Sequence, residues 1–155
     1  MAPSCQLDAT IPGRLETLAR ESFGDKAPEF VVHPQCFLSE GHFAGPDKAR
    51  IEALAETAND PSIEAIWFAR GGYGSCRVAE QAIKAMGSAA RDKLYLGYSD
   101  AGFLLAGLYA RGIGRVAHGP MPGDLNRDGG EAAVLRTLGW FLDPDAASTP
   151  TENAH

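Results

Sequence analysis

The sequence predicts an α/β domain built on a mostly parallel sheet with helices on both faces. Short apolar or β-branched runs, typical of buried strands, occur at 29–33, 65–69, 93–98 and 114–120. Segments with a helical spacing of apolar residues separate these runs, so strand and helix alternate after a first helix. Alternation of this kind favours parallel pairing with crossover helices. We therefore expect a sheet of four strands.

The expected helices cover 11–22, 46–58, 75–86, 100–110 and 130–142. In the first, Ile11, Leu15 and Ala19 recur on one face. Pro46 is a favoured residue for the first turn of the second helix. The fourth is apolar nearly all round, which predicts burial on most sides.

Length and charge limit the class of function. The 155 residues fit one domain, with 1–143 expected to fold and 144–155 expected to form a linker or a disordered tail. Twenty acidic residues against 14 basic ones give a net charge of −6, and no basic cluster occurs, so nucleic acid is not an expected partner. The longest apolar run, 101–110, is about half the length of a membrane span.

The cysteines indicate the compartment. Cys5, Cys36 and Cys76 are odd in number and far apart, which suits free thiols in a reducing environment. No secretory signal pattern is present, so we expect a cytoplasmic protein. Neither C-x-x-C nor H-x-x-x-H occurs, and no metal site is expected.

Three loops with unusual residues follow the last three expected strands. They read RGGYGS at 70–75, GYSDAG at 97–102 and AHGPMPG at 117–123. Because the carboxyl ends of parallel strands meet at one edge of a sheet, we expect these loops to lie together and to carry the function.

Ser99 stands between a strand and a helix. The pattern G-x-S-x-G is almost met, with Ala101 in place of the last glycine. Ser99 is therefore either a nucleophile on a strained turn, with the N–H of Asp100 aimed at an oxyanion, or only a helix cap together with Asp100.

The glycine loop also has more than one interpretation. This loop, RGGYGS at 70–75, either cradles a phosphate, or supplies a second oxyanion donor, or is only a tight turn. Its glycine spacing matches neither of the phosphate-binding patterns G-x-G-x-x-G and G-x-x-x-x-G-K-[ST]. Arg70 either binds a substrate carboxylate or pairs with a surface acid. His118, at the end of a strand, is either a base or a structural histidine.

The motifs IWFARGGYGSCR, YLGYSD and HGPM, in that order and separation, together resemble the LD-carboxypeptidases. These serine peptidases also include the microcin C immunity proteins. The N-terminal APSC, and GHFAG followed by DKAR, fit the same resemblance, which covers residues 2–142. It implies a flavodoxin-like or class I amidotransferase-like α/β domain followed by a β-rich C-terminal domain.

The resemblance implies roles for individual residues. Ser99 matches the nucleophile of a Ser-Glu-His triad, and the N–H groups of Asp100 and Gly72 match the oxyanion hole. Arg70, Gly71, Tyr73 and His118 are the expected substrate-binding residues. The implied reaction removes the terminal D-alanine from murein tetrapeptides in cell-wall recycling, without a metal or organic cofactor.

The same resemblance places the triad Glu and His in the C-terminal domain, and this chain ends before that domain begins. A serine without a base is a weak nucleophile, so we expect the chain alone to be nearly inactive. An uncovered apolar surface would favour homodimers or larger oligomers. Alternative functions are a hydrolase of peptidyl-nucleotides, as in the microcin immunity branch, and a non-catalytic muropeptide-binding module.

Overall fold

A three-stranded parallel sheet forms the centre of the domain. In the computed structural model, which describes residues 1–144, the strands β1 (Ala65–Trp67), β2 (Leu94–Gly97) and β3 (Arg115–His118) lie in the order β1-β2-β3. Ala65 is paired with Leu94, and Leu94 is paired in turn with Arg115. The expected α/β class with a parallel sheet is therefore confirmed.

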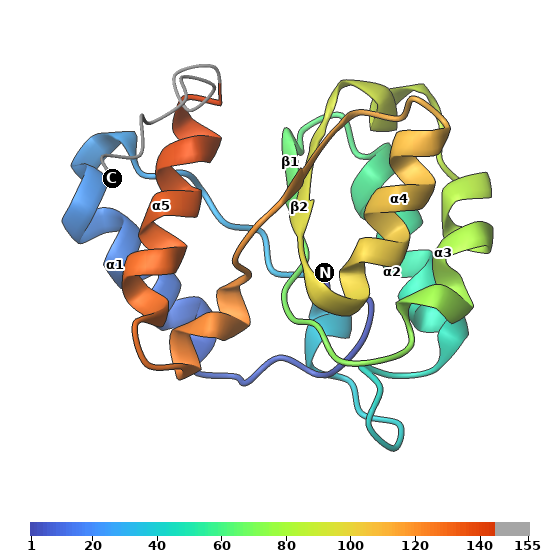
Figure 1. Ribbon diagram of the computed structural model, residues 1–155, viewed down its shortest axis with the longest axis horizontal. Helices are drawn as coiled ribbons and strands as arrows, with labels where there is room; N and C mark the ends of the chain where they lie inside the picture. The colour runs from blue at the N-terminus through green and yellow to red at the C-terminus, as the bar shows by residue number, and fades with distance from the viewer. Residues whose placement is uncertain (145–155) are drawn as a thin grey trace, which may run out of the picture.

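Helices cover both faces of this sheet (Figure 1). On one side lie α2 (Asp47–Asn59), α3 (Ser75–Lys84) and α4 (Gly102–Ala110). On the other side lie α1 (Ile11–Phe23) and α5 (Gly130–Leu142). Short 3₁₀ helices connect them, and their ranges are Gly24–Lys26 (η1), Pro34–Phe37 (η2), Ser88–Asp92 (η3), Ser99–Ala101 (η4) and Pro122–Asn126 (η5).

Two apolar cores are separated by the sheet. Ile66 and Phe68 belong to the core beneath α2, α3 and α4, whereas Trp67 and Ala69 pack with the core formed by α1 and α5. This alternation is the period of two that a strand imposes on its side chains. The edge of the Trp67 ring meets Phe141 of α5, with 5.3 Å between the ring centroids.

One expected strand is absent from residues 1–144. The segment 29–33 has no assigned secondary structure, and Val31 is 69% exposed. Only Phe30 and Val32 pack against the α1 and α5 core. Pro28 and Pro34 flank the segment, and proline cannot donate to a strand ladder. The prediction of a buried strand there, and of four strands in total, was wrong.

The fourth helix was also expected to be buried on most sides. It begins with the 3₁₀ turn η4, and Leu104, Leu105 and Leu108 are buried. Phe103 and Tyr109 are 58% and 77% exposed, so one face of α4 points outward and this prediction was wrong.

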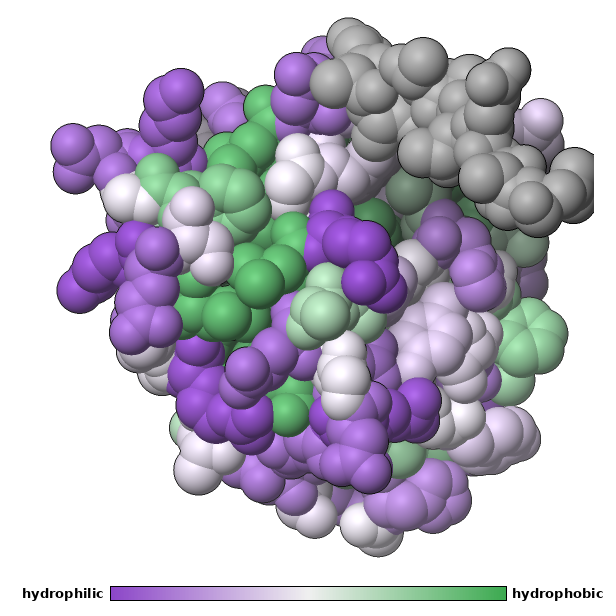
Figure 2. All heavy atoms as spheres, turned by 60° about the vertical axis from the view of Figure 1, so that its left-hand side comes forward, coloured by the Kyte–Doolittle hydropathy of each residue, from purple (hydrophilic) through white to green (hydrophobic). Residues whose placement is uncertain are grey.

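The surface of the described residues is mixed. Figure 2 turns the side that carries α1 and α5 toward the viewer and shows apolar side chains surrounded by polar ones. Within residues 1–144, no helix combines the length and the hydrophobicity that crossing a bilayer requires. The expected tail lies mostly at 145–155, outside the described residues.

Candidate active site

The three loops singled out in the sequence meet at the carboxyl edge of the sheet. Gly97 at the end of β2 is in register with His118 at the end of β3. Residues from all three loops line one cavity of about 470 Å³. Its lining includes Arg70, Gly71, Gly72, Tyr98, Ser99, Met121, Asp124 and Arg127.

Ser99 has an unusual backbone conformation. Its φ of 57° makes it the only residue other than glycine with a positive φ within residues 1–144. Tyr98 before it is extended, and η4 and α4 follow directly. The left-handed region costs an L-residue roughly 1–2 kcal/mol, and such strain is concentrated at functional sites. The turn holds Ser99 exposed at the cavity.

Glycines make the close packing around this turn possible. A Cβ on Gly71 would lie 3.1 Å from the Ser99 Cβ and 3.2 Å from its Oγ, so the glycine loop lies directly against the serine. A Cβ on Gly97 would lie 3.1 Å from that of Ala101, which is fully buried. The sequence has alanine where G-x-S-x-G has its last glycine, and this small residue still fits the packing.

The backbone offers two candidate oxyanion donors. The first N–H groups of a helix have no acceptor inside the helix, and Asp100 is the second residue of η4. Gly72 has a φ of 134°, and a Cβ there would overlap the Cys5 sulfur, so only glycine fits. Among residues 1–144, its N–H donates no backbone hydrogen bond. Both N–H groups are therefore candidates for the expected role, which stays a prediction.

The Asp100 side chain has a structural role that the sequence did not reveal. Its Oδ2 accepts hydrogen bonds from the Ser4 hydroxyl at 2.5 Å and from the Ser75 N–H at 2.8 Å. The Ser75 hydroxyl donates to the Asp100 carbonyl. The carboxylate is nearly buried and joins the N-terminal segment, the start of α3 and the Ser99 turn.

The side chain of Arg50 links the glycine loop to the N-terminal segment. Its side chain is fully buried, and Nη1 donates to the carbonyl oxygens of Pro3 at 2.6 Å and Gly74 at 2.9 Å. Its Nη2 pairs with Asp47, and its guanidinium lies over the Phe43 ring, 4.7 Å from the centroid. Nothing in the sequence pattern distinguished this arginine from a surface residue of α2.

A second network that the sequence did not reveal lies beside Ser99. The Tyr98 hydroxyl donates to Oδ1 of Asp124 at 2.7 Å and accepts from Nη1 of Arg127 at 2.8 Å. Burial, and then the hydrogen bond to Asp124, raise the pKa of Tyr98. Oδ2 of Asp124 accepts from the Met121 N–H at 2.8 Å, which fixes the third loop.

The other expected substrate-binding residues are spread more widely. Arg70 lines the cavity with Ser99 and donates to the Gln6 carbonyl at 3.1 Å. It also lines a neighbouring cavity of about 460 Å³, which includes His42 and Phe43. Tyr73 is 56% exposed and does not line the Ser99 cavity, and its ring lies 6.2 Å from that of Phe43.

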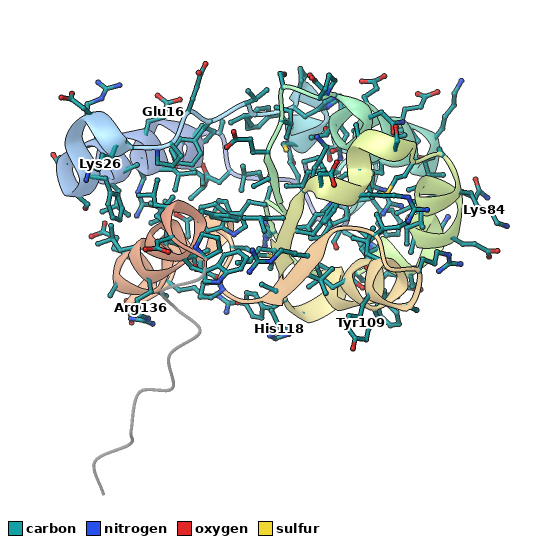
Figure 3. The ribbon with its side chains drawn as sticks, turned by 90° about the horizontal axis from the view of Figure 1, so that it is seen from above. Glu16, Lys26, Lys84, Tyr109, His118 and Arg136 are labelled. Atoms are coloured by element: carbon teal, nitrogen blue, oxygen red, sulfur yellow. The ribbon has the colours of Figure 1, made fainter. Side chains whose placement is uncertain are left out.

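His118 is exposed at the end of β3, and Figure 3 shows it pointing outward from this strand. Its ring centroid is 6.0 Å from that of Tyr98, but His118 is not among the residues that line the Ser99 cavity.

No histidine or glutamate of residues 1–144 lines that cavity. In the same part of the chain, no group of His, Cys, Asp and Glu is arranged to hold a metal ion.

The parallel sheet, its covering helices and the loop site at its carboxyl edge define an α/β domain of the kind found in enzymes. The chain belongs to the LD-carboxypeptidase N-terminal domain family (Peptidase_S66), whose model matches residues 1–119. The expected family is thereby confirmed, and with it the class of carboxypeptidase-related proteins.

Individual relatives agree with this assignment. A candidate carboxypeptidase of Rickettsia prowazekii is 28% identical over 110 residues, which are 71% of this chain and 34% of that protein. A candidate carboxypeptidase of Rickettsia conorii is 35% identical over 57 residues, or 37% of this chain and 18% of that protein. The matched region is thus about a third or less of either relative.

A solved structure has the same fold. The muramoyltetrapeptide carboxypeptidase from Oxalobacter formigenes superposes with a TM-score of 0.64 at 24% identity. The match covers 92% of this chain and 47% of that one, so this chain spans about half of the solved protein.

Proposed function

We propose that this domain supplies the nucleophile and the oxyanion donors of a serine carboxypeptidase that releases D-alanine from murein tetrapeptides. The observation that carries the proposal is the strained, exposed Ser99 held directly against Gly71 at the edge of the sheet. Family membership supports the same chemistry. In the cell, the reaction would serve recycling of cell-wall fragments in the cytoplasm.

The proposed reaction has two steps. The Ser99 Oγ attacks the scissile carbonyl carbon and loses its proton to a base, and the N–H groups of Asp100 and Gly72 bind the oxyanion. The C–N bond then breaks, D-alanine leaves with a proton on its amine, and water hydrolyses the acyl ester. Neither a histidine nor a glutamate of residues 1–144 lines the cavity, and the family resemblance assigns the base to a His and a Glu of a further domain.

Labelling with a fluorophosphonate tests the nucleophile. The full chain is incubated for long periods at mildly alkaline pH, and the modified peptide is mapped by mass spectrometry. We expect slow but selective modification of Ser99, because oxyanion donors favour attack there even without a base. Ser39 and Ser62, which are also exposed, serve as internal controls. Modification of all three at equal rates, or persistence of the adduct in Ser99→Ala, contradicts the proposal.

A further inference from the structure

The Ser99 cavity contains an arginine, Arg127, that has no role in the two steps of the proposed hydrolysis. Arg127 lines the cavity together with Ser99, and its side chain is 70% exposed, whereas that of its partner Asp124 is only 11% exposed. The Asp124 carboxylate is thus packed into the protein, whereas the Arg127 guanidinium is exposed at the cavity. Such an asymmetric pair leaves the arginine accessible to an anionic ligand.

The arginine is held in place from one side only. Nη1 donates to the Tyr98 hydroxyl, and Nε lies 3.4 Å from Oδ1 of Asp124. Because the Tyr98 hydroxyl donates its proton to Asp124, the Tyr98 oxygen acts as the acceptor for Arg127. Within residues 1–144, the Nη2 group of Arg127 has neither a hydrogen-bond nor an ion-pair partner. The fork of the guanidinium therefore has donors left over.

The other arginine of the cavity is placed differently. Nη1 of Arg70 is bound to the Gln6 carbonyl, and Arg70 stands between the two cavities. Arg127 is instead hydrogen-bonded to the side chain of Tyr98, which is the residue directly before the nucleophile. A carboxypeptidase must bind a free carboxylate one residue beyond the bond it cuts, and arginine recognises carboxylates with two parallel hydrogen bonds.

We propose that Arg127 binds the C-terminal carboxylate of the peptide substrate, and that Tyr98 and Asp124 are positioning residues that orient its guanidinium. This inference rests on the proposed function, because it names the substrate group that selects peptide ends at the Ser99 cavity. Asp124 also accepts a hydrogen bond from the Met121 N–H, so the same carboxylate fixes the loop at 117–123 and orients the Arg127 guanidinium.

A binding measurement tests this assignment without requiring turnover. A murein tetrapeptide with a free C-terminal D-alanine and the same peptide with a C-terminal amide are titrated into the full chain by calorimetry. We expect the acid to bind more tightly than the amide. Arg127→Gln should weaken binding of the acid about tenfold or more and leave the amide unchanged, because a charge-assisted pair is lost.

Three further variants complete the test. Arg136→Gln removes an exposed arginine of α5, labelled in Figure 3, that does not line the Ser99 cavity. This control variant should keep the full preference for the peptide acid over the amide. Arg127→Lys should retain only part of it, since lysine lacks the fork. Tyr98→Phe should also reduce the preference, and circular dichroism checks that each variant is folded.

The outcomes separate the two proposals. If Arg127→Gln keeps the preference of the unchanged chain, or if the unchanged chain binds the two peptides equally or not at all, the assignment of Arg127 is overturned. A Ser99 adduct in that situation leaves the proposed nucleophile standing. Conversely, an Arg127-dependent preference without any Ser99 adduct supports the carboxylate site and removes the serine mechanism.

Discussion

At the scale of single residues, the site depends on conformations that the rest of the domain must enforce. Ser99 is held at a φ of 57°, which L-residues avoid, and Gly71 leaves room for the close contact with its side chain. Strain of this kind persists only where surrounding packing determines the backbone. The turn therefore stores free energy that the fold supplies.

Replacing Ser99 by glycine should release this strain. We expect Ser99→Gly to raise the free energy of unfolding by about 0.5–1 kcal/mol, because glycine adopts positive φ without the Cβ penalty. Ser99→Ala keeps the Cβ and should leave stability almost unchanged. Urea denaturation of the two variants measures the difference. A Ser99→Gly protein less stable than Ser99→Ala would mean that the turn is not strained.

Tyr95 gives the protein a pH-dependent stability. The residue is fully buried, its hydroxyl donates to the Ala90 carbonyl at 2.9 Å, and burial raises its pKa from 10.0 to about 12. The unfolded chain loses this proton near pH 10 and the folded protein only near pH 12. The unfolded state thus binds fewer protons between these values, and stability falls as the pH rises through that window.

Tyr95→Phe should remove this alkaline loss, which amounts to roughly 2–3 kcal/mol. At neutral pH the variant should lose only about 1 kcal/mol, the usual net contribution of one hydrogen bond. Denaturation curves from pH 8 to 12 measure both effects. Tyr109→Phe, at a residue that is 77% exposed, is the matched control and should behave like the unchanged protein. Equal alkaline slopes in the two variants would refute this account.

At the scale of elements, the site is a junction of segments far apart in the sequence. The Asp100 carboxylate binds Ser4 and the Ser75 N–H at the start of α3, and Arg50 of α2 binds the carbonyls of Pro3 and Gly74. Neither side chain acts on a substrate in our proposal, in which Asp100 contributes only its backbone N–H. Both fix the glycine loop and the N-terminal segment relative to the Ser99 turn.

Removal of the Asp100 carboxylate should be costly for this reason. Asp100→Ala leaves the Ser4 hydroxyl and the Ser75 N–H unsatisfied in a buried place, and we expect a loss of roughly 2–4 kcal/mol. Asp92→Ala, at an exposed position at the end of η3, should change stability by less than about 0.5 kcal/mol. Thermal and urea denaturation compare the two. Similar losses in both variants would argue against the junction.

The elements illustrate what the sequence can and cannot predict. The helices at 11–22 and 130–142 and the last three strands were predictable, because apolar periodicity and the turn residues agree there. The strand predicted at 29–33 was wrong because β-branched residues indicate only that a segment fits a half-buried surface. They do not show that a neighbouring strand is available for pairing. Ser99 and the glycine loop were recognisable from motifs, whereas Arg50, Asp124 and Arg127 were not, since long-range hydrogen bonds leave no local pattern.

At the scale of the whole molecule, the described cavity contains the proposed oxyanion donors and the proposed carboxylate-binding arginine, but neither a histidine nor a glutamate of residues 1–144 lines it. The matched region is also about a third or less of the curated relatives and 47% of the solved neighbour. The two facts together support the proposal that catalysis needs residues beyond those at this edge of the sheet.

Turnover by this chain alone should accordingly be negligible. We expect no measurable release of D-alanine from a murein tetrapeptide, because loss of triad partners lowers serine hydrolase rates by about 10⁴–10⁶-fold. A coupled D-amino-acid oxidase assay measures the product, with Ser99→Ala as the blank. Release at an enzymic rate, absent from the blank, would mean that this chain itself supplies a base to Ser99.

The parallel order of the strands has a consequence for how the protein reaches its working state. Each loop of the site is separated from the next by a full crossover helix, so no loop can find its neighbours through contacts close in sequence. Helical content can recover early in refolding, but the pocket exists only once all three strands have docked. After a denaturant jump, far-ultraviolet ellipticity should therefore return ahead of the near-ultraviolet signal of aromatic side chains packed against the sheet, such as Trp67 on Phe141.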